Sequence, residues 1–366
     1  MATELTTAWR PDWAATPGDL LGEALEERSM SQAELARRMG RPLKTINEIV
    51  KGKQAITPKT AVQLQNVLGV AAHFWLNLQR DFDEVDARRQ EGDELAAELD
   101  WLRRFPIAEM IRRNWIAKME TRVEQLKELL GYFAIASPGA WRSHWAASPA
   151  TFRQSPSFRS KPEAVAAWLR QGERRAALVE TSPFNHAGLR ASLNRIRAMT
   201  TLDPVAFLPD LESLLAANGV AFVLVPELSG IHIAGATRWL APDKVMIQLS
   251  LRHRSNDHFW FALFHEIGHI LAGRREHLDD AKPDTVALQA SDEAEADRFA
   301  VTQLVPDAAI AKVGDLDALT ADAIRAIAEK LGVSPGIVVG RLEHARRLSP
   351  ARFRYLKKTW DWAGLH

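Results

Sequence analysis

The sequence predicts an α+β protein that is mainly α, and three observations support this class. Five short helical patterns follow one another in residues 17–80, separated by glycine and proline. Amphipathic helical patterns continue through residues 81–205. Beyond Phe207 the pattern changes to three β-rich runs, which an apolar helical run follows. We therefore expect four parts in this order: an all-helical domain (1–80), a helical spacer (81–205), a domain with a small β-sheet (206–312) and a helical cap (313–366).

The composition describes a globular protein without cysteine chemistry. The chain has 366 residues, of which 46% are hydrophobic and 25% are charged, as in soluble domains. It has no cysteine, which excludes disulfides, a thiolate nucleophile and a cysteine-bound metal. No run approaches the length of about 18 apolar residues that crosses a bilayer, and residues 1–21 lack the apolar core of a signal peptide. We therefore expect a cytoplasmic protein with no membrane partner.

Charge is unevenly distributed along a chain whose net charge is only +1. Between Arg28 and Lys59, eight Lys/Arg stand against two acidic residues, whereas between Glu276 and Asp297 eight Asp/Glu stand against one lysine. The basic stretch suits an anionic partner such as DNA. The acidic stretch contains carboxylates that could bind a metal. For both stretches the alternative is an ordinary solvated surface.

Start and stop signals divide residues 17–80 into five helices. Ser31 and Glu34 form a capping-box pattern at the start of the second helix, and Gly40 follows its end. The five helices are expected to begin near Pro17, Ser31, Pro42, Thr57 and Ala71.

A capped helix, a short glycine-containing turn and a second helix, flanked by support helices, form the helix-turn-helix arrangement. Residues 17–80 resemble the Cro/C1-type domain of phage repressors, and more closely the HigA-type antitoxin subfamily, through the segments 17–21 and 71–79. The resemblance implies a homodimer on a double-stranded DNA operator, with the third helix in the major groove. Four residues would lie near base edges and four near phosphates: Leu43, Lys44, Asn47 and Glu48, then Gln32, Thr45, Lys51 and Lys53. The alternative is a retained fold that only pairs with other proteins.

The stretch His265-Glu266-Ile267-Gly268-His269 reads H-E-x-x-H and lies within the apolar helical run 259–272. Two histidines four residues apart share one face of a helix, which is the spacing that two imidazoles need to hold one metal ion. Glu266 would lie beside the metal, where it could take a proton from water. Because the chain has no cysteine, the metal ligands must be nitrogen and oxygen atoms, a set that Zn²⁺ accepts. The alternative is a buried amphipathic helix with two satisfied histidines.

A second predicted helix, residues 291–300, offers carboxylates for a third ligand. Glu293 and Asp297 are four residues apart, and Glu293 lies 24 residues beyond His269, which leaves room for a loop and a return helix. Glu293 or Glu295 could be the third ligand. The alternative for all these carboxylates is a solvated acidic face.

The segment from about residue 206 to 306 resembles the ImmA/IrrE family of metallopeptidases. The resemblance rests on the H-E-x-x-H stretch, on residues 293–297 and on the following Phe299-Ala300 and Leu304-Val305-Pro306. It implies a zincin-like domain in which Zn²⁺ is held by His265, His269 and Glu293. It also implies Glu266 as the general base and Asp297 as the residue that orients a ligand histidine. The family further implies cleavage of a helix-turn-helix repressor, which releases a stress or mobile-element response.

A small sheet before the metal helix is typical of zinc peptidases, whose edge strand commonly holds the substrate in an extended form. The three expected strands are Val220–Val225, Ile231–Ala236 and Lys244–Leu251. Residues 235–240 are expected to cap the second strand beside the cleft, so that Arg238, His232 and His258 are candidate substrate contacts. Arg238 could equally be a turn residue. Residues 313–366 resemble a second helix-turn-helix, but such helices also cap this peptidase family, and we expect the cap.

Two functions remain open from the sequence. In the first, the chain is a DNA-binding transcriptional regulator with zinc-dependent endopeptidase activity, and its protein substrate is a helix-turn-helix repressor of a stress, toxin–antitoxin or mobile-element response. In the second, the chain is a HigA-like antitoxin and regulator that pairs with a toxin, and its peptidase domain acts as a sensor or scaffold without proteolysis.

Overall fold

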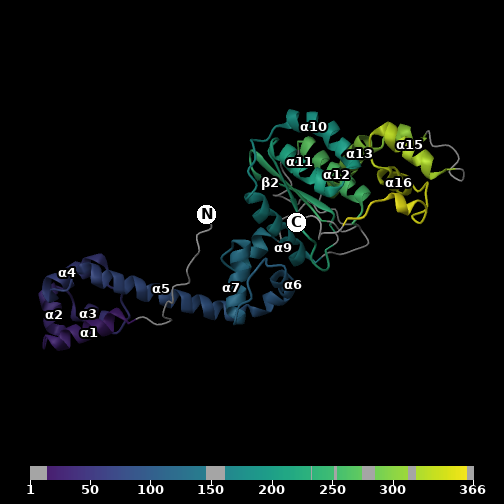
Figure 1. The fold of residues 1–366 in the computed structure, drawn as a ribbon. Helices are drawn as coiled ribbons and strands as arrows, with labels where there is room; N and C mark the ends of the chain where they lie inside the picture. The colour runs from purple at the N-terminus through teal and green to yellow at the C-terminus, as the bar shows by residue number, and fades with distance from the viewer. Residues whose placement is uncertain are drawn as a thin grey trace. The chain divides into compact units, whose positions relative to one another are not determined.

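A computed structural model describes residues 15–145, 161–231, 233–250, 254–273, 285–311 and 319–360, with the side chains of residues 285–291 left aside. The chain divides into two compact units, Met1–Leu99 (unit 1) and Asp100–His366 (unit 2). Helices dominate both units, and the one sheet among the described residues belongs to unit 2, so the expected α+β, mainly α class is confirmed (Figure 1). No helix among these residues is long and apolar enough to cross a membrane.

Unit 1 is built from short helices around a single apolar core. Its described helices are α1 (Pro17–Glu27), α2 (Gln32–Met39), α3 (Leu43–Val50), α4 (Pro58–Leu68) and α5 (Ala72–Ala97). The fully buried residues of its core include Leu21, Leu35, Ile46 and Leu64, which come from four different helices. The helix that was expected to end near residue 78 continues to Ala97, so the expected domain boundary at residue 80 falls inside α5.

The start of α1 explains the Pro17-Gly18-Asp19 pattern. Thr16 caps the helix by accepting a hydrogen bond from the backbone N–H of Asp19 (3.0 Å), and Pro17 occupies the first turn, where its missing N–H costs nothing. A Cβ atom on Gly18 would overlap the carbonyl oxygens of Ile49 (2.5 Å) and Val50. Glycine therefore lets α1 pack directly against the end of α3.

The capping box predicted at α2 is only half formed. Ser31 Oγ accepts a hydrogen bond from the backbone N–H of Glu34 (3.1 Å), as predicted. The Glu34 carboxylate instead accepts a hydrogen bond from Arg38 Nε (2.7 Å) and pairs with Arg37. Two guanidinium groups one turn away compete with the backbone N–H for the same oxygens. Gly40 then ends α2 in the left-handed conformation (φ 59°), as its position predicts.

Unit 2 begins with helices that precede the sheet. They are η1 (Leu99–Arg104), α6 (Ile107–Arg112), α7 (Arg122–Phe133), α8 (Pro138–His144), α9 (Pro162–Ala177), α10 (His186–Ala198), η2 (Met199–Thr201) and α11 (Pro204–Ala216). Aromatic rings of η1, α7 and α8 pack together, with Trp101, Phe133 and Trp141 within 6.1 Å of a neighbouring ring centroid. Trp101, Trp141 and Trp168 are thus core residues.

The sheet has three described strands, β1 (Val220–Leu224), β2 (Gly235–Ala241) and β3 (Lys244–Leu249), in the order β1-β3-β2. β1 pairs with β3 in parallel, and β2 pairs with β3 antiparallel. The second strand was expected at 231–236, which is wrong, because pairing begins only at Gly235. Ile231 and Ile233 are buried outside any strand, so their alternation reflects burial in the core and not strand pairing.

Helices cover both faces of this sheet. α9 packs on β1 and β3, and α12 (Asn256–Leu271) packs on β2 and β3. The remaining elements are α13 (Thr285–Leu304), α14 (Asp307–Ala311), α15 (Ala321–Leu331), α16 (Pro335–His344) and η3 (Arg354–Leu356). Buried residues of α12, α13, α15 and α16 belong to one apolar cluster. The C-terminal helices therefore share a core with the helix that carries the two histidines.

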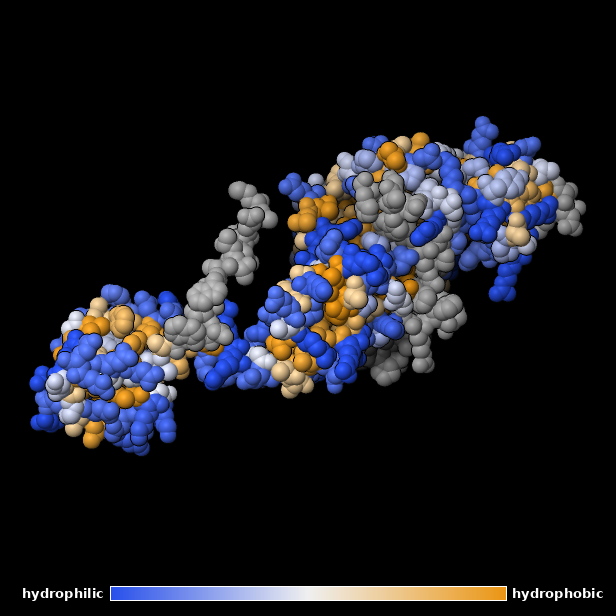
Figure 2. Space-filling model, turned by 60° about the horizontal axis from the view of Figure 1, so that its bottom comes forward, coloured by the Kyte–Doolittle hydropathy of each residue, from blue (hydrophilic) through white to orange (hydrophobic). Residues whose placement is uncertain are grey.

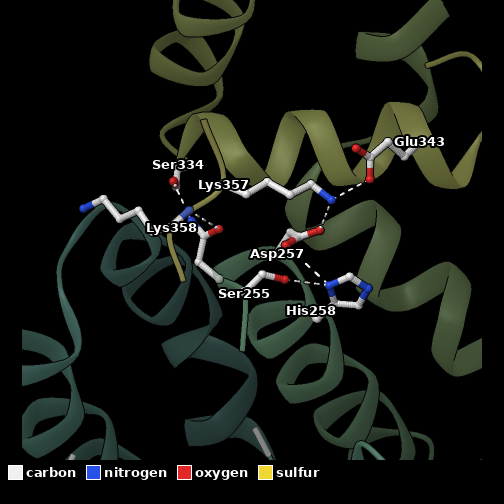
Figure 3. Close-up of polar contacts among 8 residues, drawn as sticks. Ser255, Asp257, His258, Ser334, Glu343, Lys357 and Lys358 are labelled. Atoms are coloured by element: carbon white, nitrogen blue, oxygen red, sulfur yellow. Dashed lines mark hydrogen bonds and ion pairs between the residues drawn. The ribbon is translucent and has the colours of Figure 1, made fainter. Parts of the chain in front are cut away.

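A polar network fastens the start of α12 to the C-terminal segment (Figure 3). The backbone N–H of Asn256 donates to Lys358 O (2.9 Å), and its side chain donates to Ser334 Oγ (2.9 Å). Lys357 Nζ lies 2.8 Å from Asp257 Oδ2 and 2.5 Å from Glu343 Oε2. The first turn of α12 is thus held by residues roughly 80–100 positions later in the chain.

Candidate functional site

Two helices bring the metal-binding candidates together. α12 carries His265 and His269 one turn apart, and α13 packs along α12 and carries Glu293. Gly268 faces this contact, since a Cβ atom there would lie 3.1 Å from Phe299 and 3.3 Å from the Ala296 backbone. The small residue between the histidines lets α13 approach α12.

The ligand atoms of the three residues converge on one point. His265 Nε2 lies 3.0 Å from His269 Nε2 and 3.2 Å from Glu293 Oε2, and His269 Nε2 lies 3.4 Å from Glu293 Oε1. His265 is buried, and the other two are partly buried. These residues form the metal-ligand cluster of the described part of the chain, while Glu295 is exposed on α13 and outside that cluster.

The donor set fits zinc. A tetrahedral ion with bonds of about 2.1 Å separates its ligand atoms by about 3.4 Å, close to all three distances above. The donors are two imidazole nitrogens and a carboxylate, which zinc accepts without any thiolate. Glu293 Oε2 is buried and has no hydrogen-bond partner among the described residues, as expected for an oxygen aimed at a cation.

Asp297 lies behind His265 on the side away from the cluster. Its Oδ1 is 2.9 Å from His265 Nδ1. A proton on Nδ1 shared with this carboxylate leaves the Nε2 lone pair facing His269 and Glu293. The contact therefore selects the tautomer that a metal requires.

Glu266 is buried beside the cluster and is held by the sheet. Thr237 Oγ1 of β2 donates a hydrogen bond to Glu266 Oε2 (2.7 Å). A Cβ atom on Gly235 would lie 2.7 Å from Glu266 Oε1, so only glycine leaves room for this carboxylate. Burial raises the pKa of Glu266 against the opposing charges of the two histidines and the Thr237 hydrogen bond. A carboxyl with a raised pKa is suited to exchanging protons with water.

Glu293 has the opposite electrostatic character. Burial alone would raise its pKa, but His265 and His269 outweigh burial and hold the pKa of Glu293 well below its usual range. The pKa values of these two neighbouring carboxyls, on different helices, are thus shifted in opposite directions.

Two of the candidate substrate contacts, Arg238 and His258, are not brought to this site. Successive side chains of β2 point to opposite faces, and Arg238 follows Thr237, so it points away from Glu266. Arg238 pairs with Glu173 of α9 and lies over the Trp145 ring at 5.1 Å. His258 bonds to Ser255 Oγ (2.7 Å) in the network at the start of α12. His232 lies outside the described residues.

Thr237 and Gly235 were missed by sequence reasoning. Both lie about 30 positions before Glu266, on a strand whose start was misplaced, and no local pattern marks them. The available signal was the expectation that residues 235–240 lie beside the cleft, which included both residues but gave neither of them a role.

Five of the candidate DNA contacts of unit 1 belong to α3, while Gln32 begins α2 and Lys51 and Lys53 follow the end of α3. Ile46 and Ile49 of α3 are buried in the core, which turns Lys44, Asn47 and Glu48 away from it. Lys44 Nζ lies 3.7 Å from Glu48 Oε1, and its side chain is 84% exposed. Leu43 is an exposed large apolar side chain (45%). Gln32, Thr45, Lys51 and Lys53 are partly or fully exposed.

Two family models match separate stretches of the chain. A model described as helix-turn-helix matches residues 21–75, and a peptidase-family model described as the IrrE N-terminal-like domain matches residues 238–343. The second match begins inside β2 and runs through α12 and α13 to most of α16, and it therefore includes all the metal-binding candidates.

Known proteins match the N-terminal region. The chain is 37% identical over 73 residues to the uncharacterized HTH-type transcriptional regulator YddM of Escherichia coli (strain K12). The aligned stretch covers 20% of this chain and 78% of the relative. It is 37% identical over 71 residues to Virulence-associated protein I of Dichelobacter nodosus, covering 19% of this chain and 66% of that protein.

Among solved structures, an addiction module antidote protein of the HigA family from Coxiella burnetii is 33% identical, covers 23% of this chain and 92% of its own, and has a TM-score of 0.21. The Pseudomonas aeruginosa antitoxin HigA with its higBA promoter is 31% identical, covers 24% and 95%, and has a TM-score of 0.22. Scores this low support no structural conclusion, so the assignment depends on the family models and the curated relatives.

The fold and the matches define a class of protein in which a regulator-type helix-turn-helix domain and a metallopeptidase-type domain share one chain. This chain belongs to the helix-turn-helix family through its N-terminal domain and carries an IrrE-like domain in its C-terminal half. The resemblance predicted from the sequence is confirmed.

Proposed function

We propose that this chain is a DNA-binding transcriptional regulator that is also a zinc-dependent endopeptidase. One observation carries the enzymatic part: the ligand atoms of His265, His269 and Glu293 converge within 4.8 Å of one another, next to a buried Glu266. A hydrogen bond between two histidines would explain their 3.0 Å separation, but it does not require both carboxylate oxygens of Glu293 to lie within 3.4 Å of the same two nitrogens.

The protein's own residues would act as follows. When bound, zinc would supply a Lewis acid that polarises the scissile carbonyl and lowers the pKa of water at the site. Glu266 would accept the proton of the attacking water and deliver it to the leaving amine. Thr237 would hold the Glu266 carboxylate in place, and Asp297 would keep His265 in the ligating tautomer.

The substrate would be an extended protein segment. β2 is an edge strand among the described residues, and its Thr237 contacts Glu266. A segment paired with β2 by backbone hydrogen bonds would bring its peptide bonds to the metal site. An intact helix cannot pair in this way, so we expect the cut in a linker of a helix-turn-helix repressor.

The DNA-binding part would be carried by α3. Lys44 and Asn47 face outward on a helix that follows the capped α2 and its turn, as recognition helices do. The helix-turn-helix match and the relative named as a transcriptional regulator support this proposal.

The experiment combines zinc analysis with cleavage. The purified chain is loaded with zinc and incubated alone and with each helix-turn-helix regulator encoded near its gene, and new termini are located by mass spectrometry. We expect about one zinc per chain and a cut in a linker of one regulator, and no cut by Glu266→Gln, which keeps its zinc. If Glu266→Gln cuts as fast as the parent, the mechanism is wrong. If the zinc-loaded parent cuts nothing, the chain is a regulator whose peptidase domain is a sensor or scaffold.

A further inference from the structure

A groove far from the metal ligands in sequence lies between η1, α6 and the start of α7. Its volume is about 710 Å³, which is within the range of about 300–1,000 Å³ that is common for ligand sites. We call it the α6–α7 groove. Apolar side chains form much of its lining, among them Leu102, Phe105 and Met119. In Figure 2, apolar surface bordered by hydrophilic residues is visible over the part of unit 2 that carries α6 and α7.

The rim of the α6–α7 groove is positively charged. Arg103, Arg112, Lys118 and Arg122 line it, and all four are exposed. Among the lining residues the one exposed carboxylate is Glu120, and Arg103 is already paired with Asp100 (3.0 Å). With Asp100 and Glu120 counted, cations still outnumber carboxylates at the rim, and such an excess around an apolar floor attracts a ligand that carries both negative charge and apolar groups.

The one buried carboxylate of the groove does not cancel this charge, because it already has partners. Glu109 is 8% exposed, and its Oε1 accepts from Arg113 Nη2 (2.9 Å) while its Oε2 accepts from the backbone N–H of Ser229 (2.9 Å). Burial raises its pKa, but the hydrogen bonds from Ser229 and Arg113 outweigh this, and the pKa lies below its usual value. Glu109 thus stays ionised as part of a closed pair with Arg113.

The same contacts tie the groove to the strand that contacts Glu266. Arg113 Nη2 also donates to Glu227 O (2.7 Å), so α6 holds two points of the connection between β1 and β2. That connection leads directly into β2, where Gly235 and Thr237 adjoin Glu266. A segment bound in the groove would therefore be anchored on the same rigid body as the edge strand.

The lining favours a peptide over a nucleic acid. Single-stranded nucleic acids need exposed aromatic faces on which bases stack, whereas the aromatic ring in the lining, Phe105, is only 6% exposed. An open apolar floor of this size instead accommodates leucine-like anchors of a peptide whose acidic residues meet the rim.

We propose that the α6–α7 groove docks an acidic peptide segment with apolar anchors, presented by the protein that the metal site cuts. The proposal names the chemistry of that protein and so rests on the proposed function. The docked segment lies outside the scissile stretch, which pairs with β2.

Binding can be measured without cleavage. The full-length chain with Glu266→Gln is loaded with zinc and titrated into fluorescein-labelled peptides by fluorescence anisotropy. One peptide alternates glutamate with leucine anchors. A second has lysine in place of glutamate, and a third has serine in place of leucine. We expect the first peptide to bind best and to weaken as salt is raised.

Charge reversal locates the binding. Arg112→Glu with Lys118→Glu should weaken binding of the glutamate–leucine peptide by about tenfold or more. The matched control reverses two exposed cations of unit 2 on other helices, Arg190→Glu and Lys330→Glu, and should leave binding unchanged. Ala108→Trp, which fills the groove at an exposed position of α6, should also abolish binding. Unchanged melting and zinc content would show that the variants fold.

Several results would overturn the proposal: no binding of the glutamate–leucine peptide, equal binding of the lysine peptide, or equal losses in the control pair. Binding of a single-stranded oligonucleotide that Ala108→Trp removes, without peptide binding, would do the same. None of these depends on proteolysis, so failure of the groove and failure of the enzyme are separate outcomes. Where the parent cuts a repressor, the groove variants should raise KM and leave kcat unchanged.

Discussion

The two candidate sites differ in how far each depends on the fold around it. The candidate base contacts of unit 1 lie on the outside of α3, where the Lys44 side chain is 84% exposed. The metal cluster of unit 2 is internal: the His265 side chain is 2% exposed and contacts Asp297, His269 and Glu293. Surface residues can change without disturbing the core, whereas residues that hold one another cannot. Function and stability should therefore be separable in unit 1 and coupled in unit 2.

The largest effects should come from the metal ligands. His265→Ala, His269→Ala or Glu293→Ala should remove stoichiometric zinc and lower the melting temperature of the zinc-loaded protein, because bound zinc stabilises only the folded state. Asp297→Ala should weaken zinc by about 10–100-fold, as loss of a residue that orients a ligand does. Zinc is measured by metal analysis and competition with a chelator. Glu295→Ala is the matched control and should keep its zinc. If Glu295→Ala lost zinc and Glu293→Ala kept it, Glu295 would be the third ligand.

The next largest effect should follow from Gly235→Ala. The new Cβ would lie 2.7 Å from Glu266 Oε1 and 2.8 Å from Leu249 Cδ2, so the carboxylate must move. We expect zinc content to remain and kcat to fall by roughly 10²–10⁴-fold, the usual contribution of a positioned general base. Gly131→Ala is the control, since nothing lies within 4 Å of its Cβ. Full activity in Gly235→Ala would show that Glu266 does not need its present position.

Gly18→Ala tests whether unit 1 also contains a glycine that cannot be replaced by a larger residue, as Gly235 of unit 2 is expected to be. Its Cβ would overlap backbone oxygens of α3, which cannot rotate away. We expect a loss of about 1–3 kcal/mol in the free energy of unfolding of unit 1. Gly22→Ala, on the same helix and with open space at its Cβ, should instead stabilise by about 0.5–1 kcal/mol. Denaturant titration of both variants measures these changes in the free energy of unfolding. Equal changes in the two variants would refute the close packing of α1 on α3.

The outward residues of α3 should show the separation of function from stability. Lys44→Ala or Asn47→Ala should cost about 1–3 kcal/mol of sequence discrimination, with an unchanged melting temperature. Lys51→Ala or Lys53→Ala should weaken binding to all sequences and lower the salt slope by about one each. Operator selection followed by salt titrations of binding measures both. A fall in melting temperature as large as that of the metal-ligand variants would break the contrast between the units.

The smallest effect near neutral pH should come from the network at the start of α12. Burial would raise the pKa of Asp257, but hydrogen bonds from His258, Lys357 and Ser255 outweigh it and place the pKa well below the usual range. A carboxyl whose pKa is lower in the folded state stabilises the fold fully at pH values above its pKa in the unfolded state. This stabilisation is lost as the pH falls through its pKa in the folded state. Lys357 has a raised pKa despite burial, because Asp257 and Glu343 favour its charge, and its contribution is lost only as pH rises through that raised value. The melting temperature should therefore change little with pH near neutrality. In acid it should fall less steeply for Asp257→Asn than for the parent protein.

Features that depend on neighbours in the chain were predictable. The helix starts near Pro17 and at Ser31 follow from a first-turn proline and a capping serine, and the shared face of His265 and His269 follows from the helical repeat. The boundaries of the four parts stay predictions, and so do the DNA contacts and the catalytic roles. The misplaced second strand shows the limit: a run of alternating apolar residues records burial, which a buried loop shares with a strand.

The sequence by itself determined the helical character of this protein, its family and the two histidines with their intervening glutamate, because all of these are encoded by residues within a few turns of each other. The family resemblance implied Glu293, but the residue pattern left Glu295 open, and the tertiary structure places Glu293 at the histidines. Only the tertiary structure placed Thr237 on Glu266 and Arg238 on the opposite face of the sheet. The physical reason is distance along the chain. These contacts join residues about 24–65 positions apart, and whether they form depends on how α13, β2 and α9 pack and not on any local propensity.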